Sequence, residues 1–289
     1  MHGLPTLNEI APLINDEEEC LKYLNERGVF YNRVNCCKCG NAMKLNLKRQ
    51  SWRCTKSKCY GETSIRKDSF FSNVKMPCSK LLHLAYLWLN RVSASAAITM
   101  AGVSSKTMCD FSKFFRQLVA DSLEFEECQI GGPDIIVEID ESKFGKRKYN
   151  RGHRVEGVWV LGGIERTPEK KVFVVQVPDR SAETLVAIIR RFVRPQSVIY
   201  TDLWKGYSSI TTELEVEHRT VNHSIEFVSQ DGVHTNSIEG TWCGMKLMVP
   251  KRNRTKDIDS HLWEYVWRKQ NRNRLWEAFI SALAKINYG

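Results

Sequence analysis

Three carboxylates in the second half of the sequence have the residue types and surroundings that metal-dependent chemistry on phosphodiesters requires. Asp140 ends a strand-like run over 135–140, Asp202 ends another over 197–202, and Glu239 opens a helical pattern. Three rigidly held carboxylates repel one another unless divalent cations neutralise them, and hard oxygen ligands suit Mg²⁺ or Mn²⁺. Two such ions, roughly 3.5–4 Å apart, can activate an attacking oxygen and stabilise a leaving one. The pattern predicts that Asp140, Asp202 and Glu239 are catalytic ligands of Mg²⁺ or Mn²⁺, with two ions expected.

Each of these residues also has an ordinary explanation when it is taken alone. An aspartate at the end of a strand can be a turn residue, and Glu239 can be a solvated helical side chain. Glu138 is the alternative ligand on the first strand because residues two apart share a face, whereas Glu141 points to the opposite face. The interpretation as a metal site rests on three carboxylates that occur together and in order.

Two polar residues near Glu239 extend the predicted site. Lys246 follows seven residues later, two helical turns on, so both side chains project to the same side. A lysine there could hold a phosphate beside the metals, and the ordinary alternative is a surface lysine. Asn236 could orient a DNA strand whose phosphodiester is cleaved at this site, or a metal-bound water. Alternatively, it could cap the helix. Lys246 and Asn236 are therefore included among the catalytic candidates.

Four closely spaced cysteines predict a structural zinc site. Cys36 and Cys39 form one pair, and Cys54 and Cys59 form a second pair after fourteen intervening residues. Paired thiolates on two short turns can close a tetrahedral zinc site, and the glycine after Cys39 suits a tight turn. Cys37 could replace Cys36 as a ligand. The alternative is a set of four buried structural cysteines, but the spacing favours zinc.

The composition favours a polyanionic partner and gives no sign of a membrane span. The 289 residues include 43 Lys and Arg against 33 Asp and Glu, a formal net charge of +10. This charge is compatible with nucleic-acid binding but does not decide it alone. The longest apolar runs, such as 158–164, have the length of strands, and residues 1–15 lack the features of a signal peptide. We expect an intracellular protein whose ten cysteines are mostly reduced.

The order of the predicted elements indicates an α/β fold. Strands are predicted at 135–140, 158–165, 171–177, 197–202 and near 217–222, and helices at 181–193, 236–248 and 258–287. Three strands, a helix, a further strand and a late carboxylate-bearing helix match the order of a ribonuclease-H-like fold. The predicted domains are an N-terminal helical segment at 1–30, a zinc ribbon at 31–75, a helical, helix-turn-helix-like DNA-binding domain at 76–130, and a ribonuclease-H-like catalytic domain with C-terminal helices at 131–289.

The segment 94–118 resembles a helix-turn-helix. A short apolar helix reaches Gly102, and one of the two serines that follow at 104 and 105 would cap the next helix. Lys106, Lys113 and Arg116 lie on or near this second helix and could reach phosphates. Two helices joined by a glycine also occur in folds that never meet DNA, so plain helical packing is the alternative.

A second basic stretch follows the third carboxylate. It includes Lys251, Arg252 and Arg254, which could track a phosphate backbone that continues from the active site. A run of charges is ordinarily a solvated face. Its position after Glu239 favours a contact with DNA.

The region 137–274 resembles the transposase domain of the Merlin elements of eukaryotes and of their bacterial insertion-sequence relatives. The resemblance rests on ordered motifs, namely Val137-Glu138-Ile139-Asp140-Glu141-Ser142, Val177 to Leu185, Thr201-Asp202-x2-Lys205-Gly206-Tyr207, Val221-Asn222-His223-Ser224 and His234-Thr235-Asn236-Ser237-Ile238-Glu239-Gly240-Thr241-Trp242-x3-Lys246. In that family the acidic triad falls on Asp140, Asp202 and Glu239, with the following lysine at Lys246. Some relatives use the asparagine of the same motif, so Asn236 competes with Glu239 as the third residue.

The resemblance implies cut-and-paste transposition. Protomers would bind the terminal inverted repeats through the N-terminal domain, cleave a phosphodiester at each end and join the freed 3′ hydroxyl to target DNA. Pairing two DNA ends implies a homodimer or a higher oligomer. The alternatives are a ribonuclease-H-like nuclease that does not join DNA, and a domesticated DNA-binding regulator. The likeness to Merlin elements favours a eukaryotic source, for which we expect a nuclear location. For any other source we expect the cytoplasm.

Overall fold

The chain forms two compact units. The computed structural model describes residues 3–30, 34–145, 156–221, 234–250, 253–255 and 257–287. The first unit combines Met1–Ser122 with Asn271–Gly289, and the second is Leu123–Gln270. Each unit contains its own sheet, and the second unit carries the three predicted acidic residues.

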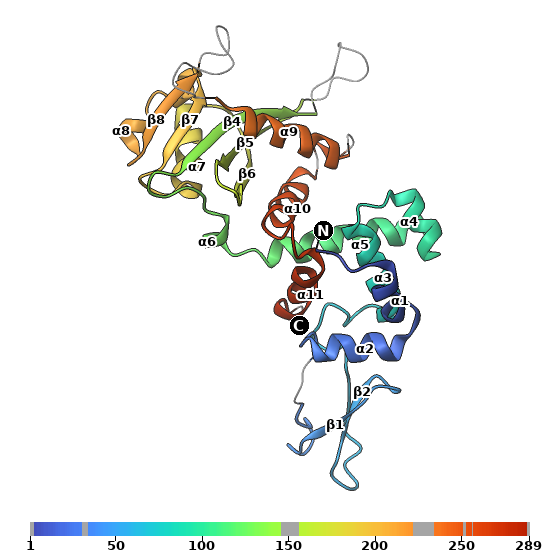
Figure 1. Ribbon diagram of the computed structural model, residues 1–289. Helices are drawn as coiled ribbons and strands as arrows, with labels where there is room; N and C mark the ends of the chain where they lie inside the picture. The colour runs from blue at the N-terminus through green and yellow to red at the C-terminus, as the bar shows by residue number, and fades with distance from the viewer. Residues whose placement is uncertain are drawn as a thin grey trace. The chain divides into compact units, whose positions relative to one another are not determined.

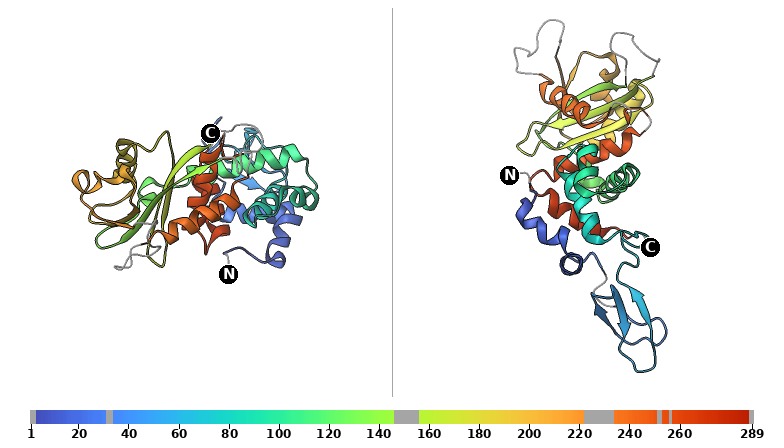
Figure 2. Two further views of the ribbon diagram at one scale, coloured as in Figure 1. Left: turned by 90° about the horizontal axis from the view of Figure 1, so that it is seen from above. Right: turned by 90° about the vertical axis from the view of Figure 1, so that its right-hand side faces the viewer.

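The first unit combines a small antiparallel sheet with helices. The sheet has the order β1-β2-β3 and comprises Met43–Asn46, Ser51–Cys54 and Glu62–Ser64 (Figure 2). Its helices are α1 (Leu7–Asn15), α2 (Glu17–Glu26), α3 (Cys78–Leu89), α4 (Ala94–Ala101), α5 (Ser105–Asp121) and α11 (Leu275–Lys285). The buried ring of Phe115 has its centroid 5.6 Å from that of Trp88 and 5.4 Å from that of Phe279. Because Phe279 belongs to α11, the C-terminal helix completes this aromatic core.

The two helices predicted within 94–118 are present as α4 and α5. Gly102 ends α4 in the left-handed conformation, with a φ of 57°, which costs glycine little because it has no Cβ. The Ser104 hydroxyl accepts the backbone N–H of Thr107 at 3.1 Å and so caps α5. The turn therefore uses the residues that the sequence indicated, with Ser104 rather than Ser105 as the cap.

The second unit is built on a five-stranded mixed sheet. The strands are β4 (Ile136–Phe144), β5 (Val158–Glu165), β6 (Val172–Val177), β7 (Val198–Asp202) and β8 (Glu217–Val221). Their order across the sheet is β6-β5-β4-β7-β8 (Figure 1). β4, β5 and β6 are antiparallel neighbours, whereas β4, β7 and β8 are parallel. The chain therefore meanders through three strands and then crosses over to the other side of β4.

Helices cover both faces of this sheet. They are α6 (Phe125–Cys128), α7 (Ala182–Phe192), α8 (Ile210–Glu213), α9 (Asn236–Met248) and α10 (Ile258–Gln270), with a 3-10 turn η1 at Lys205–Tyr207. Phe173 of β6 stacks on Phe192 of α7 with ring centroids 5.1 Å apart. The next residue, Val174, points to the opposite face, where it lines a hollow with Leu262 of α10. Thus α7 packs on one face and α10 on the other.

Two predicted boundaries were wrong, both for reasons of tertiary packing. β4 does not end at Asp140 but continues to Phe144, because β5 supplies a partner for every residue from Val137 onward, Phe144 facing Val158. The predicted helix over 258–287 is interrupted between Gln270 and Leu275. Its second part, α11, packs in the first unit, whereas the predicted domain at 131–289 had placed it with the catalytic residues.

The N-terminus of α9 is held on β4 by a fully buried carboxylate. Glu138 is 0 % exposed, and its Oε2 accepts the backbone N–H groups of Ser237 at 2.7 Å and Ile238 at 3.0 Å. Its Oε1 accepts the Nε–H of Arg166 at 2.6 Å. The same guanidinium donates to the backbone carbonyl of His234 at 2.8 Å. The first turn of a helix has unpaired N–H groups and lies at the positive end of the helix dipole. The Glu138 carboxylate accepts hydrogen bonds from those N–H groups, and its negative charge is favourable at that end.

We expect Glu138→Ala to destabilise the protein strongly. The substitution leaves the Arg166 guanidinium and two helix N–H groups without their acceptor, and breaking a buried ion pair costs about 3–5 kcal/mol. The free energy of unfolding, measured in urea, should fall by that amount. The matched control Glu169→Ala removes an exposed acid and should stay within about 0.5 kcal/mol of the wild type. A loss below about 1 kcal/mol for Glu138→Ala would contradict the anchoring role.

Candidate active site and cysteine cluster

Asp140 and Asp202 come from adjacent parallel strands at matching positions. The paired register of β4 and β7 includes Glu138 opposite Tyr200. Two residues further along each strand come Asp140 and Asp202, whose side chains therefore point to the same face as Glu138. Neighbouring strands lie about 4.8 Å apart, so this arrangement brings the two carboxylates together at the edge where β7 ends.

Helix α9 runs beside β4 in the same direction and adds the third carboxylate. Its start is bound to Glu138, and Trp242 donates its indole N–H to the Oδ2 of Asp140 at 2.9 Å. One turn later, the Nζ of Lys246 lies 5.5 Å from the centre of the Phe144 ring. Glu239 precedes Trp242 by one helical turn, so the same face of α9 carries Glu239, Trp242 and Lys246. The helix is thereby registered residue by residue against the strand.

A glycine on the neighbouring strand makes room for the Trp242 indole. Gly162 faces Asp140 across the β4–β5 pair. A Cβ at Gly162 would lie 2.5 Å from one carbon of the Trp242 ring and 3.1 Å from a methyl group of Val174. Any larger residue would displace the ring that donates to Asp140. Gly162 and Trp242 therefore position Asp140 together, a role that no local pattern in the sequence indicates.

The charge environment of Asp140 is unfavourable to its ionised form. Burial raises the pKa of Asp140 from 3.8 to about 6, the hydrogen bond from Trp242 opposes this rise, and the negative charges of Asp202 and Glu239 add to it. The carboxyl groups that the sequence grouped therefore act on one another electrostatically. A divalent cation would relieve both the burial cost and the mutual repulsion, and the donor set consists of hard oxygens.

Glu141 is a fourth acidic group beside this site. Its side chain points to the opposite face of β4, as predicted, where it meets the buried hydroxyl of Tyr207. Burial raises the pKa of Glu141 to about 7, the Tyr207 hydroxyl opposes the rise, and Asp140 and Asp202 add to it. The acidic pair Asp140-Glu141 was the available signal in the sequence, but strand alternation alone had assigned Glu141 no role.

Two alternatives for the acidic site can now be assessed. Glu138, considered as a rival metal ligand, already accepts three hydrogen bonds from Arg166 and the start of α9, so both its oxygens are engaged. Asn236 is the first residue of α9 rather than its cap, which is Thr235, and its side chain is exposed. The capping explanation for Asn236 was wrong because Glu138 satisfies the helix N-terminus instead.

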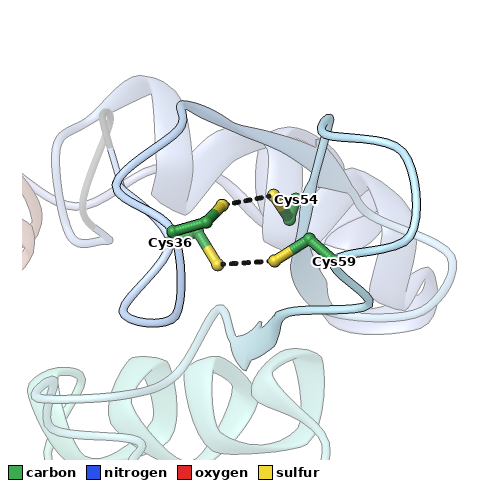
Figure 3. Close-up of side chains that lie close together, drawn as sticks. Cys36, Cys54 and Cys59 are labelled. Carbon is green, nitrogen blue, oxygen red and sulfur yellow. Dashed lines mark hydrogen bonds between the residues drawn. The ribbon is translucent and has the colours of Figure 1, made fainter.

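The four predicted zinc ligands lie together in the first unit. The sulfur atoms of Cys36, Cys39, Cys54 and Cys59 all lie within 4.8 Å of one another, a group that could hold a metal ion. The Sγ atoms of Cys36 and Cys59 are 3.6 Å apart, and those of Cys39 and Cys54 are 3.4 Å apart (Figure 3). Ligand sulfurs at about 2.3 Å from a tetrahedral zinc ion are separated by about 3.8 Å, so the spacing fits zinc.

The backbone around this cluster distinguishes Cys36 from Cys37. Cys36 is buried within the group, whereas Cys37 is exposed and stands outside it. The Gly40 backbone N–H donates to the Cys36 carbonyl at 2.8 Å, which closes the turn that presents the first pair. A Cβ on Gly61 would collide with the Sγ of Cys36. The cluster therefore uses Cys36 and needs a glycine at position 61.

The predicted DNA-contacting residues differ in how accessible they are. Lys113 is exposed, and Lys106 is exposed while paired with Asp110 at 2.8 Å. Arg116 is only 7 % exposed, because its part of α5 packs into the helical core, so its guanidinium is not displayed as the prediction required. Arg254 donates its Nε–H to the Val249 carbonyl at 3.2 Å and also contacts the Lys246 carbonyl, which closes the end of α9. Lys251 and Arg252 lie outside the described residues.

Comparisons with known proteins identify the family of this chain. The model of the ISXO2-like transposase domain family matches residues 119–271, just over half of the chain. The chain belongs to this transposase family. An uncharacterized transposase-like protein of Haemophilus influenzae is 33% identical over 103 residues, which cover 35% of this chain and 82% of that protein. Both findings support the bacterial insertion-sequence side of the resemblance that the motifs indicated.

The relative is a bacterial protein, so it does not support the nuclear location that a eukaryotic source implies. Among the described residues, no helix is both long and apolar enough to cross a membrane.

We expect Asp140→Asn to stabilise the protein at alkaline pH in buffer without divalent cations. The carboxyl of Asp140 binds its proton more tightly in the folded protein than in the unfolded chain. Its ionisation therefore begins to lower the stability as the pH rises above 3.8, and the loss is complete once the pH exceeds the folded-state pKa of about 6. The variant should gain roughly 1–3 kcal/mol at pH 8, because one pKa unit corresponds to about 1.4 kcal/mol, and nothing near pH 4. Urea unfolding at both pH values tests this.

Adding magnesium should stabilise the wild type and narrow its difference from Asp140→Asn. The exposed control Glu169→Gln should show neither the gain at pH 8 nor any response to magnesium. Equal stability of wild type and Asp140→Asn at pH 8 would show that the Asp140 carboxylate is not under electrostatic strain.

The cysteine cluster should retain zinc through purification. Metal analysis should find one zinc ion per chain in the wild type and in Cys37→Ser, because Cys37 stands outside the group. Cys39→Ser should lose the ion and unfold the small sheet, because structural zinc contributes folding energy directly. Full zinc occupancy in Cys39→Ser, or loss of zinc in Cys37→Ser, would contradict this ligand set.

Proposed function

We propose that this transposase cuts DNA at the ends of its element and joins the freed ends to target DNA at Asp140, Asp202 and Glu239. The observation that carries the proposal is the placement of Asp140 and Asp202 on adjacent parallel strands, with α9 registered beside them. The family membership supports transposase activity, and the carboxylate set supports divalent cations as cofactors.

The strand order supports a ribonuclease-H-like fold for the second unit. Three antiparallel strands, β4 to β6, are followed by α7 and by two strands parallel to β4. In this arrangement the first acidic residue lies on the central strand, the second ends its parallel neighbour, and the third comes from a late helix. The order of the three acidic residues along the chain is the order that the predicted fold requires.

The residues around the carboxylates have distinct roles in this proposal. Mg²⁺ or Mn²⁺, held by Asp140, Asp202 and Glu239, would activate the attacking oxygen and stabilise the leaving one. Trp242 fixes the Asp140 carboxylate in its rotamer through the 2.9 Å hydrogen bond. Lys246 presents an ammonium group on the same face of α9, where it would pair with a DNA phosphate. Asn236 lies one turn before Glu239, where its exposed side chain would contact DNA.

The first unit would bind the element ends. Its small sheet and the turns around the cysteine cluster carry exposed basic side chains, at Lys44, Arg53, Lys56 and Lys58. Lys106 and Lys113 add positive charge on the exposed side of α5. Such charges bind the phosphate backbone with little regard to sequence, and the α4–α5 helices would supply the selective contacts of a helix-turn-helix. Because two ends must be joined in concert, the active form would be at least a homodimer.

In this proposal, the motif likeness to Merlin elements reflects a distant relationship between those elements and this chain. The bacterial relative favours an insertion-sequence transposase, which would act in the cytoplasm, over a nuclear eukaryotic one. The chemistry proposed for Asp140, Asp202 and Glu239 is the same in both cases.

Strand transfer in vitro is the decisive experiment. Zinc-loaded protein would be mixed with manganese, a supercoiled plasmid and a labelled, pre-cleaved fragment taken from the DNA that borders its coding sequence. We expect joined product from the wild type and from Glu169→Ala, and at least a hundredfold less from Asp202→Ala, which loses a metal ligand.

Other outcomes separate the alternatives. Plasmid nicking without joining would indicate a nuclease. Zinc-dependent DNA binding with neither reaction would indicate a binding protein. Joining that survives Asp202→Ala would overturn the assignment of Asp202.

A further inference from the structure

An arginine is sandwiched between two tryptophans next to Asp202. The Arg180 guanidinium lies 4.0 Å from the centre of the Trp159 ring and 4.4 Å from the centre of the Trp204 ring. The Lys143 ammonium also lies 5.2 Å from the centre of the Trp159 ring. Aromatic faces attract cations, and planar guanidinium groups stack on them. The result is a layer of alternating aromatic and cationic groups.

The sheet topology places this layer at the edge of the proposed active site. Trp159 pairs with Lys143 on β4 and with Val177 at the end of β6. Arg180 follows the end of β6, and Trp204 follows Asp202 by two residues. Because β5 is antiparallel to β4 and β6, whereas β7 is parallel to β4, the start of β5 and the ends of β4, β6 and β7 lie at one end of the sheet. The aromatic layer and the carboxylates therefore lie at the same end of the sheet, although Lys143 and Trp159 are on the face of Glu141, opposite Asp140.

Trp204 is held firmly although much of it is in contact with solvent. Its backbone N–H donates to the Oδ1 of Asp202 at 3.0 Å. A Cβ on Gly206 would lie 2.7–2.8 Å from two atoms of the Trp204 ring, so the glycine lets the indole pack closely against the backbone. Trp204 nevertheless remains 40% exposed, and the preceding Leu203 is 56% exposed. Large apolar side chains kept on a surface, beside a reactive group, indicate a binding surface.

We propose that Trp204, backed by Arg180, stacks an unpaired nucleobase of the DNA end whose phosphate lies at Asp202. This inference rests on the proposed function, because it takes DNA to be the substrate. A base inside a duplex has both faces covered by its neighbours, so only an unpaired or extruded base offers a face to the indole. The exposed Lys205 and the half-buried Lys143 and Arg180 supply positive charge for the adjoining phosphates.

The position of Trp204 fixes which base is involved. Because Asp202 and Trp204 are two residues apart and joined by a hydrogen bond, the stacked base belongs to a nucleotide next to the phosphate held by the carboxylates. The surface would therefore keep the end of the duplex open at the point of cleavage. An aromatic–base stack is worth about 5- to 150-fold in affinity.

The test combines a protein variant with a DNA lesion. Element-end duplexes with a short single-stranded extension would carry either a normal base or an abasic site next to the scissile phosphate. Affinity would be measured for the wild type, Trp204→Ala and Trp204→Phe, each zinc-loaded. We expect the abasic site to weaken binding about 5- to 150-fold in the wild type and less than twofold in Trp204→Ala, because the same contact is then already lost. Trp204→Phe should recover most of the difference.

A matched control is available in α6, which precedes the start of β4. Phe125 is 38% exposed and lies under the Arg191 guanidinium, 5.0 Å from its ring centre, so Phe125→Ala removes an equivalent aromatic–arginine pair. This variant should respond to the abasic site as the wild type does. A 2-aminopurine at the tested position should lose fluorescence on binding the wild type but not Trp204→Ala.

The possible failures are distinguishable. If the wild type joins DNA but Trp204→Ala and the wild type respond equally to the abasic site, the base-stacking role is overturned and the proposed function stands. If the wild type neither binds nor joins element ends, the proposed function fails and the stacking role fails with it. Trp204→Ala could instead lower the affinity for all DNA probes equally while its circular dichroism spectrum stays that of the wild type. This result would show a non-specific contact and would also overturn the proposal.

Discussion

The geometry of the second unit depends on the buried carboxylate of Glu138. It receives the positive end of α9 and the guanidinium of Arg166, so a charge that would otherwise be costly inside the protein is fully compensated. Because α9 carries Glu239, Trp242 and Lys246, fixing its first turn on β4 sets the place of all three. A residue outside the proposed carboxylate site thus determines how the groups of that site meet.

The acidic site lowers the stability of the fold when its carboxyl groups are ionised. Burial raises the pKa of Asp140 to about 6, and the neighbouring carboxylates add to the rise, while the Trp242 N–H only partly offsets it. Groups held in such unfavourable surroundings are typical of functional sites, since bound cations can use the same charges. Glu138, by contrast, accepts hydrogen bonds from Arg166 and the start of α9, so two acidic residues two positions apart on β4 lie in different surroundings.

Much of this arrangement could be predicted from sequence, and the limits have physical causes. The strands at 158–165 and 197–202 and the helix at 236–248 were predicted nearly to the residue because their apolar periodicity is undisturbed. The cysteine spacing predicted the cluster, yet only the folded backbone excludes Cys37. Glu138 and Glu141 carry the same chemical group as Asp140, and their roles follow from contacts with α9 and Tyr207 that lie about 100 and 66 residues away in sequence. Such long-range contacts leave no local pattern.

The first unit is assembled from both ends of the chain. Its aromatic core contains Phe115 from α5 and Phe279 from α11, with the whole second unit encoded between them. During synthesis on the ribosome, the α5 face that receives Phe279 is made well before its partner. The helical core can close only after the second unit and α11 have emerged. Closure of the helical unit is thus coupled to synthesis of the second unit, and a chain that stops before α11 would leave apolar helix surface for chaperones and proteases to recognise.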